Sequence, residues 1–260
     1  MSSSATEVLM KAPEFRLDGK RALVTGGSRG IGLAAAFALA NAGANVTIAA
    51  RDKTGLDQAC ELLGRHGLVV SAMALDVTDP VAVSTAVPAL GAIHVLVNNA
   101  GGNRPGLLRD MSANDMEAVL ALNVTSSMLV SQAVIDGLVA AGQPGSIINL
   151  SSQYGHIGAP ERALYSAAKH GVEGYTKSLA WEVGRHGIRV NTIAPSMIET
   201  DMTKARLAEP GVREMFASKS ALDRIGQPAD LMGAIVFLAS DASSYITGAS
   251  IRVDGGTTAV

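Results

Sequence analysis

Three side chains between residues 151 and 182 are of types that could move a proton together. Tyr165 and Lys169 are four residues apart, which places both on one face of a helix, one turn from each other. A phenol is a weak acid at neutral pH, but an ammonium group one turn away favours the phenolate and lowers the phenol pKa. The pair is therefore expected to form a usable proton donor and acceptor. The alternative is an exposed pair, because Tyr-x-x-x-Lys is common by chance.

Ser152 precedes this pair and follows a short apolar run. The run SIINLSS has the pattern of a buried strand, and Ser152 stands at its carboxyl end. In open α/β sheets the carboxyl ends of the strands line the crevice that binds ligands. The hydroxyl of Ser152 is therefore expected to face a ligand site.

A second candidate site is a glycine-rich loop near the start of the chain. Residues 21–25, RALVT, predict a strand, and the Ala-rich run LAAAFALANAGA predicts a helix. Between them stand Gly26, Gly27, Ser28, Arg29, Gly30, Ile31 and Gly32. Glycines in this context let the backbone approach a pyrophosphate, which the helix N-terminus binds. The spacing G-x-x-x-G-x-G differs from the commoner G-x-G-x-x-G, and a glycine turn without a ligand is the alternative.

Two arginines predict which dinucleotide this loop prefers. The second strand, NVTIAA at 45–50, ends in Ala50, and Arg51 follows it. An acidic residue at the end of this strand would favour NAD. Arg29 in the loop and Arg51 would together favour a 2′-phosphate, so we expect NADP(H), with NAD(H) as the alternative. In that alternative Arg51 is a solvated surface residue and Asp52 contacts the ribose.

Polar residues follow three further predicted elements. Asp76 ends the strand predicted at 68–77 and could contact the adenine, because Asp79 is better placed to cap the helix starting at Pro80. Asn98 and Asn99 follow a strand at 93–97 and could tie neighbouring strand ends together. Asn123 lies inside a helix expected from about 112 to 141, where asparagine is unfavourable. A local distortion or a held water would explain it, and an exposed polar position is the alternative.

Composition narrows the function classes. The chain has 260 residues with 48% hydrophobic and 17% charged, which fits one globular domain over 1–260. The net charge of −2 gives no reason to expect nucleic acid, and no run of 18 apolar residues predicts a membrane span. One cysteine, Cys60, and five histidines without ligand spacing predict neither a disulfide nor a metal site. Residues 1–15 are expected to be a loose tail, and the protein is expected in the cytoplasm.

The elements alternate along the whole chain. About seven strands separated by helices predict a Rossmann-type, doubly wound parallel α/β sheet with helices on both faces. The later strands are expected at 147–150, from about 188 up to a loop that contains Pro195, and at 249–253, with a helix over 229–239 and the Tyr165 helix running to about 186. Residues from about 200 to 220 have weak apolar periodicity and are expected to form a flap that covers the substrate.

Six motifs in order give the chain a family resemblance from Gly19 to about Thr257. They are Thr25-Gly26-x-x-x-Gly30-x-Gly32, Asp76-Val77, Asn98-Asn99-Ala100-Gly101, Asn123, Ser152 and Tyr165-x-x-x-Lys169. The chain resembles the short-chain dehydrogenases/reductases, and Val253-Asp254-Gly255-Gly256 resembles the 3-oxoacyl reductase-like members. The resemblance implies an oxidoreductase that exchanges hydride between NADP(H) and a carbonyl or alcohol.

The resemblance also implies roles for individual residues. Ser152 would bind the substrate carbonyl, Tyr165 would exchange its proton, and Lys169 would hold the nicotinamide ribose. Asn123 would bind a water that links Lys169 to solvent. The residues expected to hold the cofactor are Gly26, Ser28, Arg29, Gly30, Ile31, Gly32, Arg51, Asp76, Val77, Asn99, Ala100, Gly101, Tyr165, Lys169, Pro195, Ile198 and Thr200.

One departure from the family pattern concerns the nicotinamide loop. Relatives usually have Pro-Gly after the sixth strand, whereas this chain has Pro195-Ser196. Serine has less backbone freedom than glycine, so a slightly different loop path is expected. Thr200 still matches the position that meets the nicotinamide amide.

The substrate is expected to be small and polar. The residues expected to line its pocket are Arg104, Gln153, His156, Arg162, Ser196, Met197 and Met202. Several are polar, which suits a polar ketone, sugar, polyol or keto acid; a 3-oxoacyl thioester is the rival. A lone loop histidine such as His156 is more often a structural donor than a catalyst. A non-catalytic NADP(H)-binding protein is a remote alternative, and the family implies a homotetramer.

Overall fold

A single parallel sheet forms the centre of the computed structural model, which describes residues 12–259. The first 11 residues of the expected 15-residue tail lie outside the described residues, and residues 12–15 are exposed without regular structure. The sheet has seven strands in the order β3-β2-β1-β4-β5-β6-β7. The strands are β1 (Arg21–Thr25), β2 (Asn45–Ala50), β3 (Val70–Ala74), β4 (Val95–Asn98), β5 (Gly145–Leu150), β6 (Ile188–Pro195) and β7 (Ser250–Val253).

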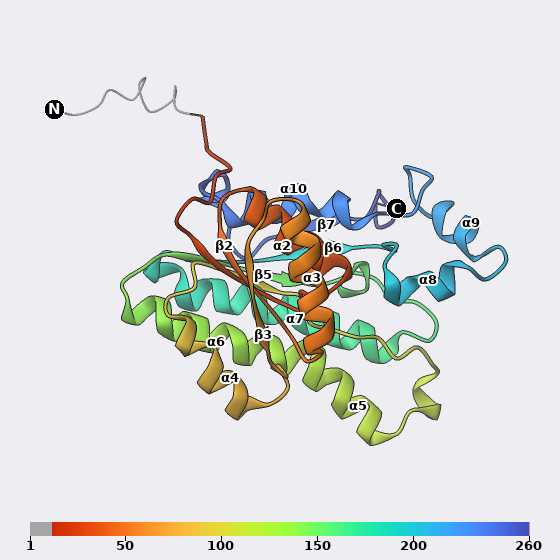
Figure 1. The fold of residues 1–260 in the computed structure, drawn as a ribbon. Helices are drawn as coiled ribbons and strands as arrows, with labels where there is room; N and C mark the ends of the chain where they lie inside the picture. The colour runs from red at the N-terminus through yellow and green to blue at the C-terminus, as the bar shows by residue number, and fades with distance from the viewer. Residues whose placement is uncertain (1–11, 260) are drawn as a thin grey trace.

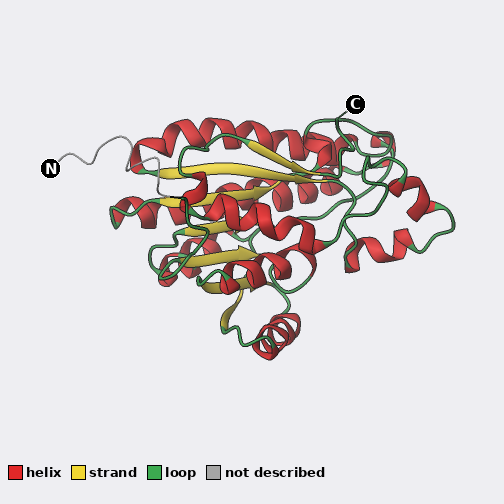
Figure 2. Cartoon of the chain, turned by 90° about the horizontal axis from the view of Figure 1, so that it is seen from above, coloured by secondary structure: helices red, strands yellow, loops and turns green. Residues whose placement is uncertain are grey.

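Helices cover both faces of this sheet (Figures 1 and 2). One face carries α2 (Gly30–Asn41), α3 (Lys53–Arg65) and α10 (Pro228–Ala239), which enclose a core that includes Leu39, Leu56 and Ile235. The other face carries α4 (Pro80–Ala86), α6 (Ser126–Ala140) and α7 (Ala163–Val183), with Val83, Val134 and Val183 in its core. The predicted fold class, a doubly wound parallel sheet, is confirmed.

Most predicted elements are present, and the differences lie at their ends. The strand predicted over 68–77 is only β3, Val70–Ala74, because the chain has left the sheet before Asp76. The Tyr165 helix ends at Val183 and continues as a single 3-10 turn to His186. Gly187 then follows with φ +72°, a conformation that ends helices and favours glycine.

The long helix expected at 112–141 is interrupted at Asn123. It consists of α5 (Ala113–Leu120), a π-helical turn at Ala121–Thr125, and α6. The predicted local distortion is therefore confirmed. By length and mean hydropathy (1.7) the segment Ala113–Ala140 could cross a membrane. Its apolar composition also suits its place here, because α6 packs on the sheet within one of the two cores.

The segment expected as a flap contains two short helices that the sequence pattern did not predict. They are α8 (Asp201–Leu207) and α9 (Val212–Ala217). Both stand out beyond one end of the sheet, at the right of Figures 1 and 2. Apolar periodicity is weak here because only Leu207 is buried within either helix.

Candidate active site

A cleft of about 750 Å³ runs along the carboxyl ends of the strands. Its walls include the residues that follow β1, β4, β5 and β6, namely Gly26, Asn99, Ser151 and Ser196. The strand order reverses between β1 and β4, and open α/β sheets bind ligands at such a switch point. The cleft therefore lies where the sequence places both candidate sites.

The glycine loop brings free N–H groups to this cleft. Helix α2 begins at Gly30, and its N-cap residue, Arg29, makes no side-chain capping hydrogen bond. The first turn also lacks an acidic side chain, so its N–H groups remain available to an anion. Gly26 and Gly30 have φ of +63° and +55°, which glycine adopts without strain. These features fit the pyrophosphate of a dinucleotide.

Gly32 and Asn99 hold this loop against the strands. A Cβ on Gly32 would lie 2.1 Å from the Gly26 carbonyl oxygen, so only glycine allows this approach. Asn99 donates from Nδ2 to the carbonyls of Thr25 and Gly26, each at 3.0 Å. Asn98 donates from Nδ2 to Asn149 Oδ1 at 2.8 Å and so ties β4 to β5. The prediction that the two asparagines join neighbouring strand ends is confirmed.

Two positive side chains line the cleft, one in the loop after β1 and one directly after β2. Arg29 and Arg51 both line the cleft and are exposed, and Arg51 lies 4.0 Å from Asp76. Asp52, the alternative ribose ligand, accepts from Thr54 N and caps α3. This part of the cleft thus offers two guanidinium groups and one carboxylate already used as a cap.

Asp76 is less free than expected. Asp79 caps α4 as predicted, by accepting from two backbone N–H groups of its first turn. However, Asp76 Oδ1 already accepts from Thr78 N at 2.9 Å and from Thr78 Oγ1 at 2.7 Å. These bonds, Thr78 Oγ1 first, lower the Asp76 pKa. Oδ2 is the oxygen that lies toward Arg51, so one oxygen of Asp76 serves the chain's own turn.

Ser152, Tyr165 and Lys169 meet in the middle of the cleft. Ser152 is 6% exposed and follows β5, whereas Tyr165 and Lys169 are in the first two turns of α7. Lys169 donates from Nζ to the Leu150 carbonyl at 2.8 Å and lies 5.6 Å from the centre of the Tyr165 ring. The three side chains that the sequence singled out therefore share one wall of the cleft.

The expected lowering of the Tyr165 pKa is wrong in this state of the site. Burial raises the pKa of Tyr165 to about 12, and a hydrogen bond with Ser152 opposes this rise only in part. Lys169 is not among the groups that lower it. Burial depresses the pKa of Lys169 itself to about 8, against an opposing contribution from Glu173. Spacing alone could not reveal this, because desolvation is a property of the folded packing. At neutral pH the phenol carries its proton.

The side chain of Asn123 is buried and already bonded to backbone. Its Nδ2 donates to the carbonyls of Gly102 at 2.8 Å and Val119 at 2.9 Å, while Oδ1 accepts from Gly102 N at 3.3 Å. The amide thereby joins the π-turn to the loop after β4. Both Nδ2 hydrogens are used, so a water could bind only an oxygen atom of Asn123.

The predicted substrate residues divide into two groups. Gln153, Ser196, Met197 and Met202 line the cleft. Arg104, His156 and Arg162 do not line it. Arg104 instead forms an ion pair with Asp115, Arg162 donates to the Glu161 carbonyl, and His156 contacts Glu173. The carboxylates that attract Arg104 and His156 are on α5 and α7, 11 and 17 residues later in the sequence, and so escaped the pattern.

A smaller side pocket of about 250 Å³ adjoins the cleft near α9. Its walls share four residues with the cleft, which are Gln153, Tyr154, Ser196 and Met197. Phe216 and Lys219 close it from the side of the predicted flap. Sequence reasoning missed Tyr154, although its place two residues after Ser152 was the available signal. Its ring makes an edge contact with Tyr165 at 6.2 Å between ring centres.

Ser196, which replaces the usual glycine, causes no left-handed backbone. The described non-glycine residues with positive φ are Glu161 and Asp223, so Ser196 is unstrained. Its hydroxyl donates to the Asp254 carbonyl at 3.1 Å and ties the loop after β6 to the end of β7. The remaining predicted cofactor residues of this loop, Pro195, Ile198 and Thr200, line the cleft as well.

Comparisons with known proteins find matches over nearly the whole chain. The model of a family described as enoyl-(acyl carrier protein) reductase matches residues 26–258. The 3-oxoacyl-(acyl-carrier-protein) reductase FabG of Vibrio cholerae is 42% identical over 246 residues, covering 93% of this chain and 98% of that protein. Gluconate 5-dehydrogenase of Gluconobacter oxydans is 39% identical over 248 residues, covering 94% and 96%.

A solved structure shares both fold and sequence with the chain. Gluconate 5-dehydrogenase from Burkholderia cenocepacia, in complex with NADP and tartrate, superposes with a TM-score of 0.90 at 36% identity. The match covers 95% of this chain and 98% of that one. The chain belongs to the short-chain dehydrogenase/reductase family of oxidoreductases, which act on CH–OH and carbonyl groups.

Proposed function

We propose that this chain is an NADP(H)-dependent oxidoreductase that transfers a hydride between nicotinamide and a carbonyl or secondary alcohol. One observation carries the proposal: Ser152, Tyr165 and Lys169 line the same cleft as the uncapped glycine loop. The nicotinamide supplies the hydride chemistry when bound, and the protein supplies orientation and proton transfer.

Each of the three side chains has a role in this proposal. Ser152 Oγ donates a hydrogen bond to the substrate oxygen and stabilises the charge that develops on it. Tyr165 Oη gives its proton to that oxygen during reduction and accepts it during oxidation. Lys169 keeps its ammonium near Tyr165 and the ribose hydroxyls. A phenol with a pKa near 12 is in the acid form that reduction requires.

The preference for NADP(H) rests on Arg29 and Arg51. Both line the cleft, and Arg29 makes no ion pair with any residue in 12–259. β2 ends in Ala50, so no carboxylate replaces them at that strand end. A 2′-phosphate would satisfy both guanidinium groups, and the NADP in the Burkholderia structure agrees with this preference.

The proposed substrate is a polar ketone, sugar, polyol or keto acid. Gln153 is 6% exposed and lines both the cleft and the side pocket, yet no residue of 12–259 bonds its buried Oε1. A buried amide oxygen without a donor costs about 1–3 kcal/mol, which a substrate hydroxyl that donates to Oε1 would recover. Relatives named gluconate 5-dehydrogenase support this class.

A 3-oxoacyl thioester is the second candidate. The relative at 42% identity is a 3-oxoacyl-(acyl-carrier-protein) reductase, and the chain spans 98% of its length. The side pocket also contains apolar walls at Ile157, Met197 and Phe216. An acyl chain would occupy those walls but would leave the amide of Gln153 unpaired.

The proposal includes a setting for the enzyme. We place residues 200–220 as a cover over the substrate, since Met202 lines the cleft and Phe216 the side pocket.

We propose one domain over 1–260, a homotetramer and a cytoplasmic location. Exposed apolar side chains on α6 and α7, including Met128, Val139 and Trp181, support an assembly. Sedimentation of a single 26.6 kDa species would reject the tetramer.

The test is nicotinamide absorbance with NADPH and NADH against a carbonyl panel. The panel holds keto sugars, keto acids, diketones, simple ketones and a 3-oxoacyl thioester, with Tyr165→Phe as the inactive control. We expect turnover of a polar carbonyl with NADPH. Faster turnover of the thioester would favour the second candidate, and tight NADPH binding without any turnover would favour a binding protein.

A further inference from the structure

A buried carboxylate lies one helical turn beyond Lys169 and has no part in the proposed chemistry. Glu173 is 6% exposed and follows Lys169 by four residues and Tyr165 by eight, so all three occur on one face of α7. Acidic side chains are almost never fully buried unless they are paired. The position therefore needs an explanation.

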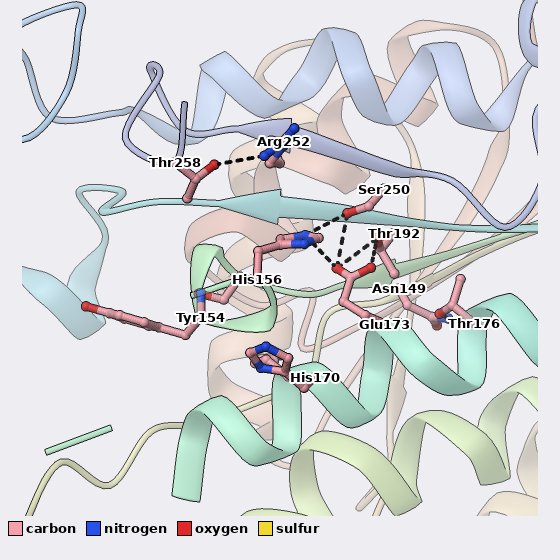
Figure 3. Close-up of polar contacts among 12 residues, drawn as sticks. Asn149, Tyr154, His156, His170, Glu173, Thr176, Thr192, Ser250, Arg252 and Thr258 are labelled. Atoms are coloured by element: carbon pink, nitrogen blue, oxygen red, sulfur yellow. Dashed lines mark hydrogen bonds and ion pairs between the residues drawn. The ribbon is translucent and has the colours of Figure 1, made fainter. Parts of the chain in front are cut away.

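Three other elements satisfy Glu173 (Figure 3). Thr192 on β6 donates from Oγ1 to both carboxylate oxygens, at 3.0 and 2.9 Å. Ser250 on β7 donates to Oε1 at 3.1 Å, and His156 Nε2 lies 3.2 Å from the same oxygen. His156 Nε2 is also 3.0 Å from Ser250 Oγ. Hydroxyl and ring N–H groups surround an acceptor, as an ionised carboxylate requires.

The His156 contact fixes the turn that follows Ser152. Residues 153–155 form a 3-10 turn directly after Ser152, and His156 is its next residue. A Cβ on Gly155 would lie 3.0 Å from Glu173 Cγ and 3.1 Å from the Lys169 carbonyl. The turn thus packs directly on α7 at Lys169 and Glu173. Its position is set by this contact and by the His156–Glu173 pair.

Glu173 also bears on the charge of Lys169. The Lys169 ammonium is 5% exposed, and its hydrogen-bond partner, the Leu150 carbonyl, is neutral. Burial lowers the Lys169 pKa, and the charge of Glu173 raises it in opposition. The other titratable side chains labelled with Glu173 in Figure 3 are Tyr154 and His156 from the turn, His170 from α7 and Arg252 from β7, whereas β6 contributes Thr192.

We propose that Glu173 is a positioning residue of the active site. Its carboxylate keeps the buried ammonium of Lys169 charged and, through His156, ties the Ser152 turn to the helix that carries Tyr165 and Lys169. The inference rests on the proposed roles of those three residues. It adds Glu173 to those three side chains. Unlike them, Glu173 touches neither substrate nor cofactor.

Glu173→Gln tests the charge while keeping the shape. An amide can still accept from Ser250 and His156 through Oε1 and donate to Thr192 Oγ1 through Nε2, so the variant should fold. Losing the negative charge should lower the Lys169 pKa by about one unit. The kcat of carbonyl reduction should then fall about fivefold at pH 8 and less than about twofold at pH 6. KM for the carbonyl substrate should stay unchanged. Glu182→Gln, exposed on the same helix, is the matched control.

Three results would overturn the charge role. They are no loss of kcat at pH 8, an equal loss at both pH values, and the same pH-dependent loss in Glu182→Gln. An equal loss would mean that Glu173 has a purely structural role. Absence of turnover by the unmutated protein would instead reject the proposed function, and the tie to the turn is then tested without activity.

His156→Ala provides that second test and also covers misfolding of the Glu173 variant. The His156 side chain is 27% exposed, so its removal leaves little empty space in the core. Amide hydrogen exchange in residues 152–157, followed by mass spectrometry, should accelerate relative to the unmutated chain. His186→Ala, exposed beyond the end of α7, is the control. Unchanged exchange in His156→Ala would overturn the tie.

Discussion

The floor of the cleft and its cover are built in opposite ways. The floor comprises Ser152, Tyr165 and Lys169. Of these, Ser152 and Lys169 are less than 7% exposed and are hydrogen-bonded to a turn and to a strand end. The cover, residues 200–220, consists of two helices of seven and six residues with few buried side chains. Proton transfer needs atoms held to within fractions of an ångström, whereas substrate selection tolerates variation. The difference supports the proposal that proton transfer resides in the floor, while the cover, together with Gln153 beside Ser152, selects the substrate.

The largest effect is expected from Tyr165→Phe, which removes the proton donor and keeps the ring. Loss of a positioned general acid costs about 10²–10⁴-fold in rate, so kcat should fall by that factor. NADPH affinity, measured by fluorescence titration, should stay within about twofold. Tyr154→Phe is the control, because that hydroxyl belongs to a neighbouring ring. Retention of most activity by Tyr165→Phe would place the chemistry elsewhere.

Gly32→Ala should disrupt the glycine loop, which lines the same cleft as the floor. The added Cβ would lie 2.1 Å from the Gly26 carbonyl oxygen and 2.5 Å from Asn99 Nδ2, so backbone must move. Overpacking of this kind costs about 1–3 kcal/mol, and NADPH affinity should fall with the melting temperature. Gly64→Ala on α3, where a Cβ meets nothing within 4 Å, should be neutral or stabilising. Similar melting temperatures for both variants would contradict the close approach.

Arg29→Ala and Arg51→Ala should change cofactor choice and leave the floor intact. Each removes one charged hydrogen bond to the 2′-phosphate, about 1.5–3 kcal/mol, so KM for NADPH should rise about 10- to 100-fold. KM for NADH should hardly change, because NADH lacks that phosphate. Arg65→Ala is the control, because Arg65 is an exposed arginine that is paired with Glu61. An equal rise for both cofactors would show that the arginines only stabilise the loop.

Arg213→Ala should loosen the cover alone. Arg213 bonds Glu199, which also accepts from Gln227 Nε2 at 3.0 Å, so this side chain joins α9 to the body. KM for the carbonyl should change, while kcat and the melting temperature stay within error because the pair is exposed. Arg206→Ala breaks an ion pair within the cover itself, so KM for the carbonyl, kcat and the melting temperature should all stay unchanged. A fall in kcat equal to that of the floor variants would remove the distinction between the two regions.

The residues of the floor were predictable from sequence, whereas for the proposed cover the sequence predicted the position but not the two helices, for a physical reason. Ser152, Tyr165, Lys169 and the glycines occupy regular elements, where spacing of four residues or a strand end fixes direction. The alternation of strands and helices likewise predicted the sheet. Residues 200–220 have no such period, because only Leu207 is buried within their two helices and they present no continuous apolar face.

Two errors show what spacing leaves out. The Tyr165 pKa is raised chiefly by burial, and no interval in the sequence reports desolvation. His156 was placed near the substrate because it follows Ser152, but the partner that draws it away, Glu173, is 17 residues later and on another element. A Glu at i+4 from Lys169 was visible in the sequence, although its meaning depends on the buried hydroxyls of Thr192 and Ser250.

The order of the strands has a consequence for how the molecule reaches its native state. β1 lies beside β4, more than 60 residues later in the chain, and every strand pair is parallel, so no pair can form as a local hairpin. Three helical connections, through α2, α3 and α4, separate the two strands of this central contact in the chain. Chains dominated by such distant contacts fold slowly and expose unpaired strand edges on the way. We therefore expect refolding yield to fall steeply with protein concentration, well before the folded protein itself becomes unstable.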